Sequence, residues 1–575
     1  MKTAICFFSL SIFTLVILSV KTSFAQQKQK ADLILINGDI ATMDDSKPAA
    51  EAVAVKNGTI MAVGSNSEIK QLAGTKTKTI DLKGKFLMPG FNESHAHFWG
   101  LGEFKQNIDL TGTKNWDEIV ALVKEAVKKA RPGEWILGRG WHQEKWDNAP
   151  QPNIGGFPFH NALSKISPDN PVILKHASGH AIFVNAKAMQ LAGITNNTPN
   201  PEGGIIMRDI GGNAIGVFHE NAADLIQAVY DRFLQERTPE KKKADWLKTL
   251  AYAVKECKEK GITTFNDAGS TFQDIDYLKE VVNAGKLDIR LSAMIMENNA
   301  AIKNNISKYR LIGYGNNHLT VREIKRYIDG ALGSRSAWFL QPYSDMPGQS
   351  GLNVVPLDEL KETAEIAIQN GFQLCIHAIG DRGNREVLNI YEETFKEHPD
   401  KKDLRWRIEH AQHLSLQDIP RFGELGVIAA MQTCHCTSDA GFVPKRIGDK
   451  RAEEGAYVWQ KLMKTGAVIC NGTDSPVEPV DPVRNFYSAV TRKYDGGKEF
   501  YPDQKMSRME ALKSYTVNGA YASFEENLKG KIKPGMLADF TVLSNNLLNC
   551  PEDEILKTKV IYTIVGGKTI YSSKQ

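Results

Sequence analysis

Hydrophobic and polar positions follow two alternating patterns through the middle of the chain. Short apolar runs rich in β-branched residues predict strands. The segments between most of them, such as "LDELKETAEIAIQNG" and "RGNREVLNIYEETFKEH", repeat apolar residues every three or four positions, which predicts amphipathic helices. The eight predicted strands are Phe86–His95, Ile262–Asp267, Ile289–Met296, Val321–Asp329, Phe372–Ala378, Arg405–His410, Val427–Thr433 and Ala467–Asp474. Eight alternating units of this kind predict an α/β fold, a (β/α)8 TIM barrel.

Both ends of the chain show another pattern, of short strands joined by tight turns. "EAVAVKNGTIMAVGS" contains the hairpin signal Asn57-Gly58, and "KVIYTIVGGKTIYSS" contains the turn Gly566-Gly567. Neither end has enough strands for a stable sheet of its own. We therefore expect residues 31–88 and 531–575 to form one small composite β-sandwich domain, and residues 89–530 to form the barrel.

The first two predicted strands of the barrel are separated by far more chain than a crossover helix needs. Residues from about 101 to 260 are therefore predicted to form an inserted subdomain. It includes a helical pattern, "WDEIVALVKEAVKKA", and a stretch rich in tryptophan, glycine and proline. We expect this subdomain to lie over the mouth of the barrel.

Polar side chains with metal-binding or catalytic chemistry fall at or near the carboxyl ends of the predicted strands, where TIM barrel enzymes build their sites. They are His95, His97, Lys325, His377, His410 and Asp474. His95 and His97 are two positions apart, so their side chains share one face of a strand. Imidazole and carboxylate ligands suit a borderline ion such as zinc, and a site with an open position is catalytic rather than structural. Asp474 could both bind the ion and accept a proton from water.

Each of these residues has another interpretation when it is taken alone. His95 and His97 could be two polar residues at a strand end, and His377 could hydrogen-bond a backbone carbonyl. Asp474 could cap the turn in "TDSP". Their agreement with one rim of the barrel favours a centre with one or two divalent transition-metal ions, and zinc is the expected ion.

Composition adds two constraints. The 71 basic and 67 acidic residues give a net charge of +4, which gives no reason to expect a nucleic-acid partner and leaves a small molecule as the expected substrate. Residues 1–25, "MKTAICFFSLSIFTLVILSVKTSFA", have the charged start, apolar stretch and small terminal residues of a secretory signal peptide. We expect an exported protein, periplasmic or secreted, without stable membrane insertion after cleavage. An uncleaved membrane anchor is the alternative, and a homodimer remains open.

Motifs around these residues resemble those of the metal-dependent amidohydrolase superfamily, in the family 3 branch that includes N-substituted formamide deformylase. In chain order they are "LMPGFNESHAHF", "GHAIFVNAKAMQLAGI", "PEGGIIMRD", "IDGALGSR", "PYSDMPGQSG", "IHAIGDRGN", "RIEHAQH", "GTDSPVEPVDP" and "IKPGMLADFTVL". The resemblance runs from about Ala31 to the C-terminus. It is specific for the branch and much less specific for a substrate.

The resemblance implies a role for each candidate residue. His95 and His97 would hold the more buried metal ion together with Asp474, which would also be the general base and then the general acid. His377 and His410 would hold a second ion, and a carboxylated Lys325 would bridge the two ions. The resemblance further implies that His180 and Arg382 reach toward the substrate.

Some positions depart from the family pattern. Arg326 follows Lys325 where many relatives have an apolar residue, although strand alternation would direct Arg326 outward, toward the helices. If Lys325 is not carboxylated, one ion is expected instead of two. Four other histidines, each either a substrate contact or a residue behind the site or at the surface, are His142, His176, His413 and His435.

The leading functional hypothesis is hydrolysis of a non-peptide C–N bond in a small amide, N-formyl or N-acyl compound by metal-activated water. Cyclic amide hydrolysis, deamination and ester hydrolysis are alternatives on the same site. A non-catalytic periplasmic binding protein is a further alternative, but it would be expected to lack metal ligands.

Overall fold

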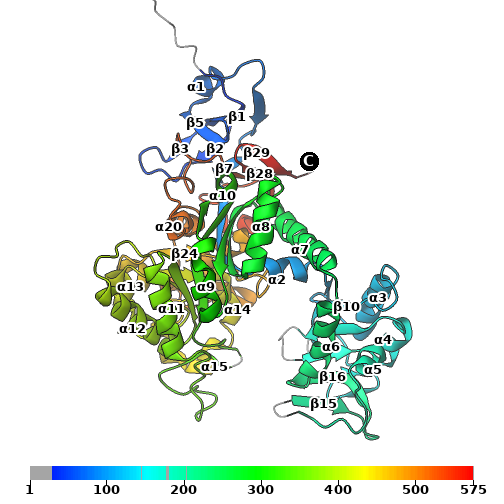
Figure 1. Ribbon diagram of the computed structural model, residues 1–575. Helices are drawn as coiled ribbons and strands as arrows, with labels where there is room; N and C mark the ends of the chain where they lie inside the picture. Colours follow the sequence, from blue (N-terminus) through cyan, green and yellow to red (C-terminus); the bar gives the residue numbers. More distant parts are fainter. Residues whose placement is uncertain (1–28, 144–145, 177–180, 202–203, 334, 574–575) are drawn as a thin grey trace, which may run out of the picture.

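The computed structural model describes residues 29–143, 146–176, 181–201, 204–333 and 335–573. The expected signal peptide, residues 1–25, lies outside these ranges. Among the described residues, none of the helices combines the length and the apolar character needed to cross a membrane. Figure 1 shows a central barrel, a smaller body of strands above it and a further lobe at its lower right.

The central body is a barrel of eight parallel strands surrounded by helices, which confirms the predicted α/β barrel. In order around the barrel the strands are β8 (Phe91–Ala96), β17 (Ile262–Ser270), β18 (Arg290–Ile295), β20 (Leu319–Tyr327), β21 (Gln373–Ala378), β22 (Arg407–His410), β23 (Ile428–Met431) and β24 (Ile469–Asn471). The barrel closes just beyond the end of β24. There the Asp474 N–H donates to the His95 carbonyl at 2.9 Å, and the His97 N–H donates to the Ser475 carbonyl at 2.8 Å.

Helices cover the outside of the barrel because each of them has one apolar face. Those between successive strands include α7 (Pro239–Glu259), α8 (Phe272–Asn283), α9 (Asn299–Tyr309), α11 (Leu357–Gln369), α12 (Asp381–Glu397), α13 (Ile419–Leu425) and α17 (Trp459–Lys464). In α12, for example, Val387, Leu388 and Tyr391 are buried toward the strands, while charged residues face solvent. This burial holds the strands, and therefore the side chains at their ends, in fixed positions.

The first predicted barrel strand, Phe86–His95, is wrong in one respect because it is two strands. β7 (Phe86–Pro89) pairs with β2 (Asp39–Ala41) and β27 (Phe540–Leu543), outside the barrel, and only β8 is a barrel strand. Gly90 lies between them, and a Cβ atom at this position would overlap the Thr263 side chain of β17. The chain therefore passes from one sheet to the other at a point where only glycine fits.

Two sheets built from the chain ends form the smaller body of strands. The first is β5 (Thr59–Gly64), β4 (Ala52–Lys56), β1 (Leu33–Ile36) and β6 (Lys78–Asp81). The second is β29 (Lys568–Ser572), β28 (Val560–Val565), β27, β7, β2 and β3 (Ala49–Ala50), so it takes strands from both ends. A buried ion pair joins this body to the barrel, because Arg290 of β18 donates two hydrogen bonds to Asp539, at 2.6 and 2.9 Å.

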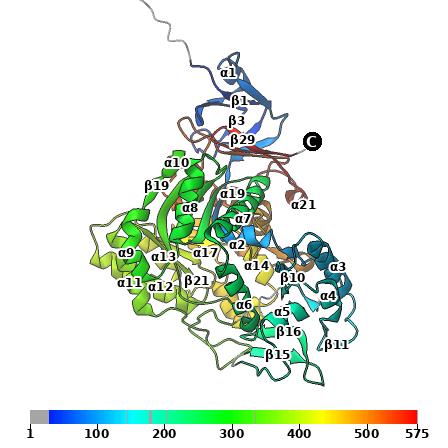
Figure 2. The same cartoon turned by 45° about the vertical axis from the view of Figure 1, so that its right-hand side comes forward.

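The lobe at the lower right of Figure 1 is inserted between β8 and β17. Its sheet consists of β15 (Gly204–Arg208), β16 (Ala214–Glu220), β14 (Ala181–Val184), β13 (Val172–His176), β10 (Ile136–Trp141) and β9 (Ile108–Asp109). The chain enters through α2 (Phe98–Phe104) and returns through α7, which pack together with the rings of Trp99 and Trp246 4.7 Å apart. The lobe lies at the lower right of the barrel in Figure 1 and extends below it in Figure 2, and its expected place over the mouth of the barrel stays a prediction.

Candidate metal centre

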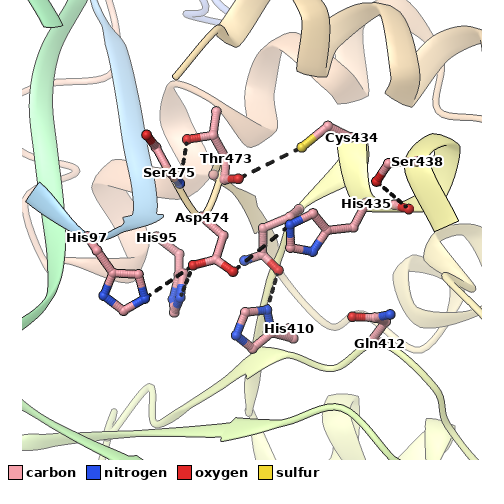
Figure 3. Close-up of polar contacts among 12 residues, drawn as sticks. His95, His97, His410, Gln412, Cys434, His435, Ser438, Thr473, Asp474 and Ser475 are labelled. Atoms are coloured by element: carbon pink, nitrogen blue, oxygen red, sulfur yellow. Dashed lines mark hydrogen bonds and ion pairs between the residues drawn. The ribbon is translucent and has the colours of Figure 1, made fainter. Parts of the chain in front are cut away.

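His95 and His97 project from the end of β8 toward Asp474, as Figure 3 shows. Their Nε2 atoms lie 3.6 and 3.3 Å, respectively, from the same carboxylate oxygen, Asp474 Oδ1. His95 is fully buried, and its other ring nitrogen, Nδ1, contacts the Glu409 carboxylate. The spacing of two residues along the strand therefore does place both imidazoles on one side of the barrel wall.

His410 reaches the same place through an unusual backbone conformation. Arg407 and Glu409 of β22 point into the barrel, so strict alternation would direct His410 outward. Its φ angle of 73° lies in the left-handed region, which turns the side chain back toward the centre. The ring centre lies 4.8 Å from that of His95 and 4.5 Å from that of His377. Strained backbone of this kind is concentrated at functional sites.

Asp474, three residues after the end of β24, also has a left-handed φ angle, 55°. One ligand atom from each of His95, His410 and Asp474 lies within 4.8 Å of the others. Burial raises the pKa of Asp474, but the neighbouring imidazoles of His95 and His97 outweigh this effect and hold the pKa well below its ordinary value. Asp474 is therefore an ionised carboxylate at neutral pH, as a metal ligand must be.

His377 and Lys325 extend the site along β21 and β20. The His377 ring packs against His410, and its Nε2 lies 3.4 Å from Asp329 Oδ1. Lys325 is fully buried, with Nζ 4.4 Å from the ring centre of Tyr327, and that ring lies 5.1 Å from the ring of His377. The structure thus brings all six candidate ligands to one end of the barrel.

Arg326 points outward, in the direction that strand alternation predicts. Its guanidinium donates to Thr363 Oγ1 of α11 at 3.3 Å and to Asn299 Oδ1 of α9 at 2.8 Å. The arginine that departs from the family pattern therefore contacts the helices and leaves the interior position to Lys325.

The donor set fits a divalent transition-metal ion. Several buried polar atoms here have no hydrogen-bond partner, among them Nε2 of His95, Nε2 of His377, Nζ of Lys325 and Oδ1 of Asp474. A buried polar atom without a partner costs about 1–3 kcal/mol, so four of them at one end of the barrel favour a bound ligand. Burial, aided by the adjacent His377, lowers the pKa of His410 well below its ordinary value, which keeps its imidazole neutral and able to coordinate.

Sequence reasoning missed the residues that orient the imidazoles. Arg407 donates to both carboxylate oxygens of Glu409, from Nε at 2.7 Å and from Nη2 at 2.9 Å, and Glu409 in turn contacts His95 Nδ1. Gln432 Oε1 lies 2.6 Å from His410 Nδ1. Such contacts fix the tautomer and leave Nε2 free for a metal. The signal was present in "RWRIEH", where Arg407 and Glu409 are two apart and share a face.

Glu409 is held in its ionised form. Burial raises its pKa, but the guanidinium of Arg407 and the imidazole of His95 outweigh burial and lower the pKa to about 2. The carboxylate is therefore ionised at any pH at which the protein is expected to work, and it can accept the Nδ1 proton of His95.

The other predicted substrate contacts lie on separate elements. His180 lies outside the described residues. Arg382, at the start of α12, pairs with Glu386 at 2.7 Å and lies over the Trp338 ring, 5.2 Å from its centre. In the inserted lobe, the rings of His142 and His176 lie 4.5 Å apart.

Two further histidines follow β22 and β23. The buried ring of His413 packs on Tyr457 and Phe339, away from the ligands. His435, by contrast, has its Nε2 4.0 Å from Asp474 Oδ2 and therefore belongs to the centre (Figure 3).

Comparison with known proteins agrees with this geometry. A sequence model of the Amidohydrolase family matches residues 78–571. "Protein LONG AFTER FAR-RED 3" of Arabidopsis thaliana is 34% identical over 561 residues, which cover 94% of this chain and 92% of the relative. "N-substituted formamide deformylase" of Arthrobacter pascens is 25% identical over 552 residues, covering 94% and 99%.

Solved structures give the same result. The crystal structure of an uncharacterized metal-dependent hydrolase from Pyrococcus furiosus matches with a TM-score of 0.73 and 27% identity, covering 90% of this chain and 100% of that chain. One family model therefore matches most of the chain, and a solved structure of a metal-dependent hydrolase has the same fold. The chain belongs to the amidohydrolase family and is a hydrolytic enzyme that acts on carbon–nitrogen bonds.

Proposed function

We propose that this enzyme hydrolyses a C–N bond in a small amide, N-formyl or N-acyl compound, with one or two divalent transition-metal ions, zinc being the expected ion. One observation carries the proposal. Buried imidazole, amine and carboxylate atoms without hydrogen-bond partners converge at the carboxyl end of the barrel. The similarity to an N-substituted formamide deformylase supports the N-formyl and N-acyl classes.

The protein residues have separable tasks in this proposal. His95, His97, His410, His377 and Asp474 would hold the metal. When bound, the metal supplies Lewis acidity toward a carbonyl oxygen and makes water easier to deprotonate. Asp474, ionised at neutral pH, accepts a proton from the attacking water and returns it to the leaving nitrogen, so that an amide and water give an acid and an amine.

The surroundings of Lys325 support a role as a bridging ligand. Its amine is fully buried, has no hydrogen-bond partner and lies beside the tyrosine ring that contacts His377. We propose that its free amine forms an N–C bond with CO2 and releases one proton to solvent, which gives a carbamate with two oxygens that would be available to metal ions. Among the described residues, none donates to or accepts from this amine within hydrogen-bond distance.

We also propose that the enzyme is exported, on the strength of residues 1–25. Cell fractionation followed by N-terminal sequencing of the purified protein tests this. A mature chain that begins close after Ala25, recovered outside the cytoplasm, is the expected result. An intact N-terminus in the cytoplasmic fraction would contradict it.

The activity is tested by metal analysis combined with a substrate screen. The purified protein should contain one or two transition-metal ions per chain, and activity should disappear with a chelator and return with zinc. The screen should include N-formyl amines, N-acyl amino acids, lactams and esters, with amine release as the readout for the first three. Full activity in a metal-free preparation would end the proposal, and turnover of esters alone would assign a different bond.

A further inference from the structure

His435 lies at the edge of the candidate metal centre, on a helix whose first turn is hydrogen-bonded to its neighbours. The helix is α14 (Thr433–Asp439), which begins directly after β23. Asn485 accepts the Cys434 N–H at 2.8 Å through Oδ1, and Asn471 accepts the Thr433 N–H at 3.2 Å. Because these bonds tie the first turn to β24 and to α18 (Pro482–Thr491), the position of the His435 ring is fixed by the barrel wall.

The ring of His435 presents an unused polar atom to the centre. The residue is 8% exposed, and its Nε2 is buried without any hydrogen-bond partner. Nε2 lies 4.0 Å from Asp474 Oδ2, the carboxylate oxygen opposite the one that faces His95 and His97 (Figure 3). A separation of 4.0 Å is too long for a hydrogen bond, so His435 Nε2 and Asp474 Oδ2 do not hydrogen-bond each other.

The position of His435 argues against a role as a metal ligand. Its ring is stacked parallel to that of His410, with an interplanar angle of 9° and centres 6.2 Å apart. Its Nε2 faces Asp474 Oδ2, whereas His95 and His97 both face Oδ1. Because Nε2 and Asp474 Oδ2 are only 4.0 Å apart, two neighbouring atoms of one reacting group can contact them at the same time.

We propose that His435 is a catalytic residue whose Nε2–H donates a hydrogen bond to the carbonyl oxygen of the scissile amide. This inference rests on the proposed function. The bond strengthens as negative charge develops on that oxygen during attack by water, which is the condition for accelerating the chemical step. Asp474 and His435, whose facing atoms are 4.0 Å apart, then act on neighbouring atoms of the reacting group, the first on the proton of the attacking water and the second on the charge of the carbonyl oxygen.

Two variants test the inference in the metal-loaded, full-length enzyme with the best substrate from the screen. His435→Phe keeps a flat ring against His410 but removes the donor. His435→Gln keeps an amide N–H that can reach the same region. We expect His435→Phe to lower kcat by about 10²- to 10³-fold with little change in KM, and His435→Gln to retain more activity.

Two further measurements separate this role from others. The metal content of both variants should equal that of the wild type, because His435 is not a ligand. A phosphonate analogue of the tetrahedral intermediate should bind His435→Phe more weakly by about the factor lost in kcat, whereas the product amine should bind equally well. His398, a half-buried histidine that pairs with Glu365 at 2.9 Å at the end of α12, provides the control: His398→Phe is a histidine replacement on the outside of the barrel.

The outcomes are distinct. A wild-type enzyme without any hydrolytic activity overturns the proposed function itself. An active wild type with either a fully active His435→Phe variant, a loss of metal in that variant, or unchanged binding of the phosphonate overturns the inference alone. If His435→Phe does not fold, His435→Ala takes its place, since full activity, a loss of metal or unchanged phosphonate binding in that variant overturns the inference equally.

Discussion

Replacement of Glu409 by alanine should damage both the stability of the protein and its affinity for metal, for reasons that can be separated. Glu409, Arg407 and His95 are all fully buried, and Glu409 accepts hydrogen bonds from Arg407 at 2.7 and 2.9 Å. Removal of one partner of such a pair leaves an uncompensated buried charge, so the free energy of unfolding should fall by about 3–5 kcal/mol.

The second effect concerns the imidazole that Glu409 orients. Without the carboxylate, His95 Nδ1 loses its partner, and loss of such a contact usually weakens metal binding by about 10- to 100-fold. This corresponds to about 1.4–2.7 kcal/mol of binding free energy. Glu409→Gln keeps an oxygen that can accept from Nδ1, so it should recover part of the metal affinity while the stability stays low.

Urea denaturation of the metal-free protein measures the first effect, and chelator competition for zinc measures the second. Glu393→Ala is the matched control, because Glu393 pairs with Lys361 at 2.8 Å on the surface, where both side chains are about half exposed. It should change stability by no more than about 0.5 kcal/mol and leave metal affinity unchanged. Because the pKa of Glu409 is about 2, the differences should persist between pH 5 and 8. If Glu409→Ala retains both wild-type properties, the reasoning about this buried pair is refuted.

Three other replacements probe the centre and its surroundings. Asp474→Asn should keep the fold and lose most turnover, and normal rates in a kinetic assay would remove Asp474 as the base. Lys325→Ala should bind fewer metal ions than the wild type by elemental analysis, and a variant that keeps two would contradict the carbamate bridge. Burial lowers the pKa of His413 to about 3, whereas a histidine in the unfolded chain has a pKa of about 6.5. Between these values the unfolded chain binds more protons than the folded protein, so the free energy of unfolding falls as the pH decreases. From pH 7 to pH 5 this histidine should lower the free energy of unfolding by about 2 kcal/mol. Urea denaturation at the two pH values should find this loss in the wild type and not in His413→Gln. If the free energy of unfolding changes equally with pH in both proteins, His413 is not buried in its neutral form.

The barrel could be predicted from the sequence because its signals are local. Each βα unit contains its own apolar strand and its own amphipathic helix, and the predicted strand Phe372–Ala378 differs from β21 by a single residue. The division of Phe86–His95 into two strands could not be predicted in this way. It depends on the approach of Thr263, which is far from Gly90 in the sequence, to a glycine inside an otherwise continuous apolar run.

The candidate ligands were also accessible from the sequence, since strand alternation and the carboxyl-end rule identify them without coordinates. The limits of that rule are visible at His410. Alternation alone would have directed its ring out of the barrel, and only the left-handed backbone at this residue brings it to the centre. The role of His435 was equally hidden, because α14 shows no pattern that distinguishes a ring facing Asp474 from one facing solvent.

The sequence by itself determined the order of strands and helices, the identity of the polar residues at the strand ends and the family resemblance, because all of these are carried by neighbouring residues. The tertiary structure alone decided which of those residues meet. Glu409 orients His95 across 314 positions of chain, and Asp474 closes the barrel against the end of β8. Such contacts arise from closure of the sheet upon itself, and no local pattern of hydrophobic and polar residues records which atoms that closure leaves buried without a partner.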